Sequence, residues 1–165
     1  MASEPSLSAG VPAPPVGITA GDAAVDRAGI LVVDDRAENL LVVRTMLEDL
    51  GHDIVTARSG DDALRCLLDR DFAVVLLDVN MPGMDGLETA TYIRARQRSQ
   101  HTPIIFLTAY VEEMNTAKGY ALGAVDYMLT PVVPVVLRAK VKVFVDLFLM
   151  IKYIKIGPDN LMKKH

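Results

Sequence analysis

A chain of 165 residues, 51% of them hydrophobic, can bury one ordinary core and leaves little material for a second domain. Its formal net charge of −4 argues against a nucleic-acid-binding surface, which needs clustered basic residues to displace counterions from phosphates. The single cysteine, Cys66, excludes an internal disulfide and is expected to pack as a small apolar side chain in a reducing compartment.

Residues 1–28 are predicted to form a disordered leader. Residues 1–29 contain four prolines and many Ala, Ser and Gly, and the first Lys or Arg is Arg27. A secretory signal would start with basic residues and continue with an unbroken apolar stretch, and this segment has neither. The most apolar stretch, 143–156, is interrupted by an aspartate and two lysines, so no membrane span is expected. The cytoplasm is therefore the expected location.

From Ile30 the chain alternates between two kinds of segment. Short apolar or β-branched runs, typical of buried parallel strands, lie at 30–33, 53–57, 72–77, 103–108 and 124–129. The segments between them have helical patterns. Leucines and valines recur at three- and four-residue spacing from Leu40 to Leu50, before Gly51 as a helix stop.

Two further helices are indicated by their ends. Ser59 is a plausible N-cap for the second helix, and acidic residues follow it in the first turn. The third, 86–98, ends in Arg94, Arg96 and Arg98, charges that favour the negative end of a helix. Five strands with intervening helices predict an α/β fold: a flavodoxin-like, doubly wound (βα)5 sandwich with a five-stranded parallel sheet and right-handed crossovers.

Three aspartates stand where predicted strands end. Asp34 and Asp35 follow the first strand, and Asp78 ends the third. If these strands are neighbours, all three acids gather at the carboxyl edge of the sheet, where open α/β sheets bind ligands. Such carboxylates repel one another unless a hard divalent cation lies among them, and Mg²⁺ suits an all-oxygen site. The alternative, that these acids are loop residues or helix caps, is weakened by the third aspartate.

From about Ile30 to Lys142 the chain resembles the receiver domains of two-component response regulators. The resemblance rests on four pieces in order: Asp34–Asp35, DVNMPGMDG at 78–86, Thr108 followed by Ala109, and GAVDYMLTP at 123–131. Their spacing also fits, with 43 residues from Asp35 to Asp78 and 30 from Asp78 to Thr108. The receiver domain is therefore expected at 29–142.

The resemblance implies a phosphorylation site. Asp78 would take a phosphoryl group from the phosphohistidine of a histidine kinase or a phosphotransfer protein. Asp35, Asp78 and the backbone carbonyl of Asn80 would bind Mg²⁺ directly, and Asp34 would bind it through water. The only catalysis expected is self-phosphorylation and autodephosphorylation at Asp78.

The resemblance also implies a switch. The hydroxyl of Thr108 would move to the phosphoryl group, Tyr127 would turn inward, and Tyr110 would tune the lifetime of the phosphate. The alternative for all three is an ordinary strand or loop residue. The output face would consist of the fourth helix, the fifth strand and the fifth helix, and would bind a downstream protein or an output domain.

One position departs from the family pattern, because Thr130 precedes Pro131 where the family has a lysine. A lysine would donate a charge-assisted hydrogen bond worth roughly 1.5–3 kcal/mol, against about 0.5–1.5 kcal/mol for a neutral donor. Two hypotheses therefore stand: a phosphorylation switch with altered coupling, and a pseudo-receiver that docks partners without phosphate. A third, a flavodoxin-like cofactor binder, is disfavoured because no Gly-rich phosphate loop follows the first strand.

The C-terminal part, 143–165, is predicted to extend the last helix and end in a tail. One apolar stripe at heptad-like spacing comprises Leu137, Val141, Phe144, Phe148 and Ile151. A second stripe comprises Val143, Leu147, Met150 and Ile154. We expect the second stripe to pair with another copy of the chain or to lead to an output region beyond it. Alternating apolar residues from Val141 to Leu149 also fit a strand.

Overall fold

A computed structural model describes residues 27–113, 115 and 126–156. Five parallel strands form one sheet in the order β2-β1-β3-β4-β5. They are β1 (Gly29–Val33), β2 (Asp53–Ala57), β3 (Val74–Asp78), β4 (Ile104–Thr108) and β5 (Asp126–Leu129). The predicted fold class is confirmed. The third strand begins two residues later than predicted, and the predicted strand residues 124 and 125 lie outside the described residues.

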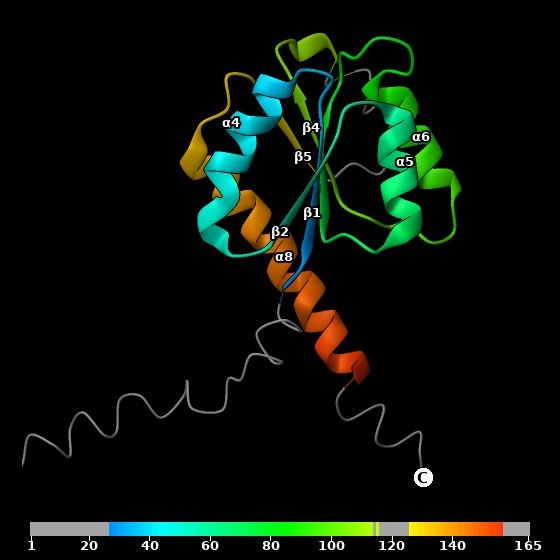
Figure 1. Ribbon diagram of the computed structural model, residues 1–165, viewed down its shortest axis with the longest axis vertical. Coiled ribbons are helices and arrows are strands. Elements are labelled where there is room, and N and C mark those ends of the chain that lie inside the picture. Colours follow the sequence, from blue (N-terminus) through cyan, green and yellow to red (C-terminus); the bar gives the residue numbers. More distant parts are fainter. Residues whose placement is uncertain (1–26, 114, 116–125, 157–165) are drawn as a thin grey trace, which may run out of the picture.

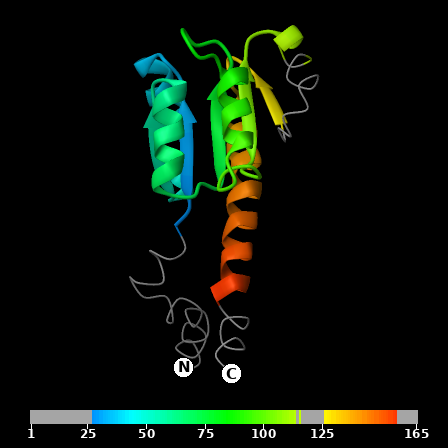
Figure 2. The same ribbon diagram turned by 90° about the vertical axis from the view of Figure 1, so that its right-hand side faces the viewer.

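Helices cover both faces of this sheet (Figures 1 and 2). The helices are α4 (Ala37–Leu47), the 3₁₀ turn η1 (Glu48–Leu50), α5 (Gly60–Asp69), α6 (Gly86–Ala95) and α8 (Pro134–Ile156). Side chains of α5 and α6 pack with one set of strand residues, and those of α4 and α8 pack with the other. Because both faces are covered, β1 is buried over its full length, and β3 and β4 are apolar up to their last residues, Asp78 and Thr108.

Local signals explain where the helices start and stop. The Ser59 hydroxyl accepts a hydrogen bond from the Asp62 amide at 3.1 Å, which confirms the predicted cap of α5. Asp85 caps α6 in the same way, through the Glu88 amide at 2.8 Å. Gly51 has a φ of 78°, a left-handed conformation that glycine adopts without strain, and it ends η1.

The prediction for the end of α6 was partly wrong. The helix stops at Ala95, so Arg96 and Arg98 do not lie in its last turn. Instead, Arg96 donates to the carbonyl of Leu64 at 3.1 Å and Arg98 to that of Leu68 at 2.6 Å. These arginines therefore tie the chain after α6 to the neighbouring helix α5.

The first described residues already belong to the packed structure. Ala28 is fully buried, and its amide donates to Nδ1 of His52 at 3.1 Å. Residues 1–26 of the predicted leader lie outside the described residues.

Helix α8 confirms that the last helix continues beyond residue 142, and the strand alternative for residues 141–149 is wrong. Its first half packs on the sheet, where Leu137, Val141 and Val145 are buried, and its second half projects from the domain (Figures 1 and 2). Packing thus continues beyond residue 142, the expected end of the domain. Among the described helices, none combines the length and apolar character needed to cross a membrane.

Candidate functional site

Three carboxylates converge at one edge of the sheet because β1 and β3 are adjacent and parallel. Val33 pairs with Leu77, so the residues that follow each strand emerge side by side. Asp34, Asp35 and Asp78 each offer a carboxylate oxygen, and these oxygens lie within 4.8 Å of one another. Asp34 is buried, while Asp35 and Asp78 are half-buried. The structure thus brings together the three acids that the sequence analysis selected.

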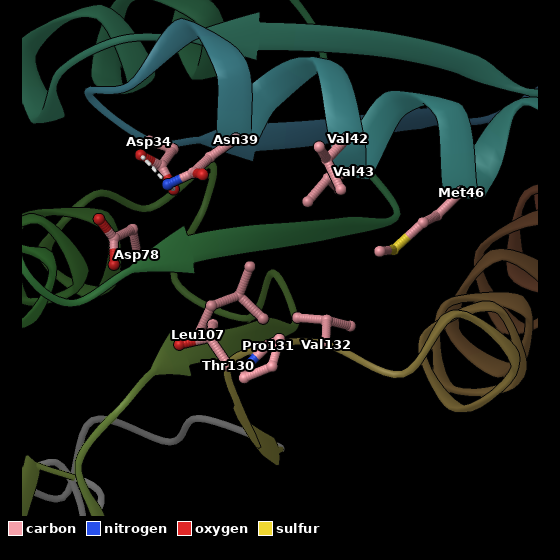
Figure 3. A pocket seen from close by; sticks show the side chains of 10 residues that line it. All are labelled: Asp34, Asn39, Val42, Val43, Met46, Asp78, Leu107, Thr130, Pro131 and Val132. Atoms are coloured by element: carbon pink, nitrogen blue, oxygen red, sulfur yellow. Dashed lines mark hydrogen bonds between the residues drawn. The ribbon is translucent and has the colours of Figure 1, made fainter.

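Asp34 is held in place by its own loop and by α4. Its Oδ1 accepts from the Arg36 amide at 2.9 Å, and the Asn39 amide donates to both carboxylate oxygens at 3.2 and 3.4 Å (Figure 3). Burial raises the pKa of Asp34, these hydrogen bonds oppose the rise, and the charge of Asp35 adds to it. Arg58 fixes the same loop by donating to the backbone carbonyl of Asp35 at 2.8 and 3.2 Å.

The carboxyl of Asp78 has a strongly raised pKa. Burial, followed by the nearby charge of Asp34, raises its pKa to about 7. A hydrogen bond from the Asn80 amide at 3.3 Å opposes this rise. A cation bound beside Asp78 would offset the effects of burial and of the neighbouring acid and would favour the ionised form.

The loop after Asp78 depends on two glycines. Gly83 has a φ of 74°, in the left-handed region. Gly86 packs so closely that a Cβ there would lie 2.3 Å from the carbonyl oxygen of Asp78, and its amide donates to Val79 at 2.8 Å. Gly86 therefore allows the start of α6 to press against the backbone that carries Asp78.

The donor set suits magnesium. Three clustered carboxylates are hard oxygen ligands, and Mg²⁺ binds through one or two such groups while water fills its remaining positions. No lysine, arginine or histidine is among the described residues that line the adjacent pocket. The residues present therefore fit the ion, with Asp35 and Asp78 as half-buried carboxylates open to it.

A pocket of about 390 Å³ runs from these acids towards α4 and the start of α8. Asp34, Asn39 and Asp78 line one end (Figure 3). The other end is apolar and includes Met46 and Val132. Thr130 also lines the pocket, and its bond to Pro131 is cis.

Thr108 ends β4 in the same region and is almost fully buried. Its hydroxyl accepts from the Tyr110 amide at 3.1 Å and donates to the carboxylate of Glu113. The side-chain amide of Asn80 donates to the same Glu113 oxygen at 3.0 Å. Two donors beside Asp78 thus share one glutamate, while Tyr110 itself is 58% exposed.

Tyr127 lies in β5, beside β4. Its ring stacks on Phe106, with centroids 6.1 Å apart and planes inclined by 19°. Partial burial, with a contribution from the charge of Asp126, raises the pKa of its phenol. The ring is half-buried and packs against the core on the α5 and α6 side of the sheet.

Sequence reasoning missed three residues of this site: Asn39, Arg58 and Glu113. Asn39 had a usable signal, since a polar side chain in the first turn after an acidic loop often faces that loop. Arg58 follows β2, whose carboxyl end lies beside that of β1, so its position was also accessible. The role of Glu113 was not predictable, because Glu112 precedes it and the sequence does not show which of the two glutamates faces the site.

Comparison with known proteins agrees with this geometry. The family model described as "Response regulator receiver domain" matches residues 30–142. The transcriptional regulatory protein ResD of Bacillus subtilis (strain 168) is 42% identical over 113 residues, 67% of this chain and 46% of the relative. SrrA of Staphylococcus aureus (strain NCTC 8325 / PS 47), also a transcriptional regulatory protein, is 39% identical with the same coverage. This chain therefore spans about half the length of the curated relatives it matches.

Solved structures give the same match. The Vibrio cholerae chemotaxis protein CheY4, crystallised at low pH, has a TM-score of 0.65 and 32% identity, covering 70% of this chain and 97% of that one. The receiver domain of the Francisella response regulator 1452 has a TM-score of 0.65 and 27% identity, covering 73% and 98%.

Proposed function

This chain belongs to the response regulator receiver domain family, and we propose that it is a phosphoacceptor whose Asp78 takes a phosphoryl group from a histidine kinase or a phosphotransfer protein. The observation that carries the proposal is the convergence of Asp34, Asp35 and Asp78 at the carboxyl edge of the sheet. A pKa of about 7 for Asp78 further supports it, because perturbed carboxyls gather at functional sites.

The reaction uses Asp78 as the nucleophile. One carboxylate oxygen attacks phosphorus, an O–P bond forms, and the N–P bond of the phosphohistidine breaks. The imidazole nitrogen keeps that electron pair and takes up a proton. Asp78 must be ionised to attack, so the acids around it have to be neutralised in part.

Asp35, Asp78 and the Asn80 backbone carbonyl would hold Mg²⁺, with Asp34 acting through water. When bound, the ion offsets the repulsion between the carboxylate and the phosphoryl oxygens. Asn39 and the Arg36 amide keep Asp34 oriented for this role. Autodephosphorylation is the attack of water on phosphorus, which returns Asp78 and releases inorganic phosphate.

The modified site would act through Thr108 and Tyr127. Thr108 would donate its hydroxyl to a phosphoryl oxygen, and Tyr127 would change its packing beside it. The output surface would include the fourth helix, most of which lies outside the described residues, with β5 and α8. We place this switch in the cytoplasm, acting on a protein target or an attached output domain.

The projecting half of α8 supports a homodimer. The second apolar stripe is exposed: Val143 by 56%, Leu147 by 47%, Met150 by 59% and Ile154 by 51%. Steps of four, three and four residues give the spacing of a two-helix seam. Pairing with the same stripe of a second copy would remove it from water.

The test is incubation of the protein with Mg²⁺ and acetyl phosphate, followed by intact-mass measurement. A mass increase corresponding to one phosphoryl group is expected, and it should be absent in Asp78→Asn. Asp71→Asn, at an exposed acid before β3, is the matched control and should still be modified. Beryllofluoride, a phosphoryl mimic, should perturb the NMR signals of Asp78 and Thr108. Silence with both reagents would overturn the proposal.

A second candidate function is a docking module that ignores phosphate. The observation that favours it is Thr130, a neutral residue on the pocket that holds Asp34 and Asp78. Without a cation at that position, a phosphoryl group would be held less firmly. Retained partner binding by Asp78→Asn, together with silence in both assays above, would select this alternative.

A further inference from the structure

The carboxylate of Glu113 accepts hydrogen bonds from the Thr108 hydroxyl and from the side-chain amide of Asn80. We propose that Glu113 is a positioning residue that holds Thr108 and Asn80 in the unmodified protein and is displaced when Asp78 is phosphorylated. This inference rests on the proposed function. In this proposal Glu113 competes with the phosphoryl group for the Thr108 hydroxyl, and this competition lowers the affinity of the site for the phosphoryl group.

The contacts are specific and link distant parts of the chain. The Thr108 hydroxyl and the Asn80 side-chain amide both donate to Oε1 of Glu113, the second at 3.0 Å and across 33 residues of sequence. Glu113 is half-buried, and its own amide donates to the Tyr110 carbonyl at 3.2 Å. The glutamate therefore links the turn after β4 to the loop after β3.

The hydroxyl of Thr108 has one proton, so it can donate to only one acceptor at a time. Its oxygen already accepts from the Tyr110 amide, and its proton points to Glu113. For Thr108 to donate to a phosphoryl oxygen on Asp78, it must release Glu113. The phosphoryl group and Glu113 consequently compete for one hydrogen bond.

Charge makes the competition stronger. Glu113 lies close enough to Asp78 that its negative charge contributes to the raised pKa of that carboxyl. The acyl phosphate carries about two negative charges where the ionised carboxylate carried one, so it repels Glu113 as well as taking its donor. Displacement would free the short helical turn at 111–113 from Asn80 and from the end of β4. Modification at Asp78 would thereby reach the segment that follows β4.

The test compares Glu113→Gln with wild type. Glutamine has the same shape but no charge, so the competitor is weakened while the turn is preserved. In the presence of Mg²⁺, we expect beryllofluoride to bind Glu113→Gln about three- to tenfold more tightly, which is the range for removing one close like charge in a partly exposed site. A variant that merely damaged the fold would bind less tightly, so the direction of the change is diagnostic.

Two controls make the test specific. Glu112→Gln removes the same charge one residue earlier and should leave beryllofluoride affinity within about twofold of wild type, because Glu112 is exposed and solvent screens exposed charges. In a Thr108→Ala background the gain from Glu113→Gln should shrink, since the contested hydroxyl is gone. In the unmodified protein without metal, Glu113→Gln should shift the NMR signals of the Asn80 side-chain amide, whereas Glu112→Gln should not.

The outcomes separate this inference from the proposed function. Equal affinity of wild type and Glu113→Gln, or an equal gain from Glu112→Gln, overturns the role of Glu113 while phosphorylation of Asp78 stands. Unmoved Asn80 amide signals in Glu113→Gln overturn it as well. If neither protein binds beryllofluoride or reacts with acetyl phosphate, the proposed function itself has failed and this inference fails with it.

Discussion

The amide of Thr130 donates a hydrogen bond to the carbonyl of Thr108 at 2.9 Å, which joins the ends of β4 and β5 at the candidate site. The contact continues the ladder in which Thr108 pairs with Leu129. Position 130 is therefore anchored through its backbone, and its side chain faces the pocket that Asp34 and Asp78 line. A longer side chain at this position would extend into that pocket.

Replacing Thr130 by lysine should strengthen the response to phosphate. A lysine ammonium near Asp78 would lower the pKa of that carboxyl and donate a charge-assisted hydrogen bond to a phosphoryl oxygen, worth roughly 1.5–3 kcal/mol. Beryllofluoride affinity in Mg²⁺ should rise by about tenfold or more, the equivalent of that energy. Calorimetric titration measures this affinity.

Thr130→Val, which replaces the hydroxyl by a methyl group, is the control and should not show the gain. If Thr130→Lys changed neither the phosphorylation rate nor the phosphate-induced shape change, Thr130 would not limit the switch.

The pH dependence of stability should report the carboxyl of Asp78 in the metal-free protein. The pKa of Asp78 is about 7 in the folded state, against an ordinary value of 3.8. Between these two pH values Asp78 is therefore protonated in the folded protein but ionised in the unfolded chain. The stabilisation is fully present below pH 3.8 and is lost as the pH rises through 7. Asp78→Asn mimics the protonated form and should stabilise the protein more at pH 8 than at pH 5, by about 1–2 kcal/mol after allowance for solvent screening. Urea unfolding at the two pH values checks this. The same gain at both would contradict the assignment.

Magnesium affinity should depend on Asp35 more cleanly than on Asp34. Asp34 accepts hydrogen bonds from Arg36 and Asn39, so replacing it also disturbs the loop. Among the described contacts, the Asp35 carboxylate has no such structural hydrogen bond, because Arg58 binds only its backbone carbonyl. Asp35→Asn should therefore weaken Mg²⁺ binding by roughly tenfold or more with little loss of stability. Its melting temperature should rise less on adding Mg²⁺ than that of wild type.

The control for this experiment is Asp61→Asn, which removes an equal charge from the exposed first turn of α5. It should retain the full rise in melting temperature with Mg²⁺. Matching responses from the Asp35 and Asp61 variants would mean that the ion binds elsewhere or only through diffuse charge.

The sequence predicted the fold and the acidic cluster best, because the positions of apolar runs and of the aspartates that follow them depend on strand burial alone. Apolar runs ending in aspartate predicted both the parallel sheet and the meeting of Asp34 with Asp78, because strand ends in such a sheet share an edge. Contacts between loops were not predictable in this way. The link from Glu113 to Asn80 depends on how two loops fold over the edge of the sheet, and neither residue type nor spacing encodes that approach. The prediction that Arg96 and Arg98 lie at the end of α6 was wrong for a related reason. Their side chains donate to backbone carbonyls of the neighbouring helix α5, a contact between elements that the sequence does not encode.

The last prediction concerns the exposed stripe of α8. Shortening the chain at Lys142 would be a poor test of pairing, because it would also remove Val145, which is buried at 1% exposure, and the packed Phe144 and Phe148. Substitution of exposed residues leaves that packing intact. The double variant Val143→Lys with Met150→Lys places two charges on the stripe and should convert a dimer into a monomer in light scattering.

Stability separates lost pairing from lost folding in this experiment. Because both side chains are more than half exposed, the unfolding free energy of the monomer should change by no more than about 0.5 kcal/mol. Val135→Lys, at a residue 64% exposed near the start of the same helix and outside the stripe, should leave the dimer intact. A monomeric wild-type chain would defeat the dimer proposal at once, and a dimer that survives both lysines would show that the contact lies on another surface.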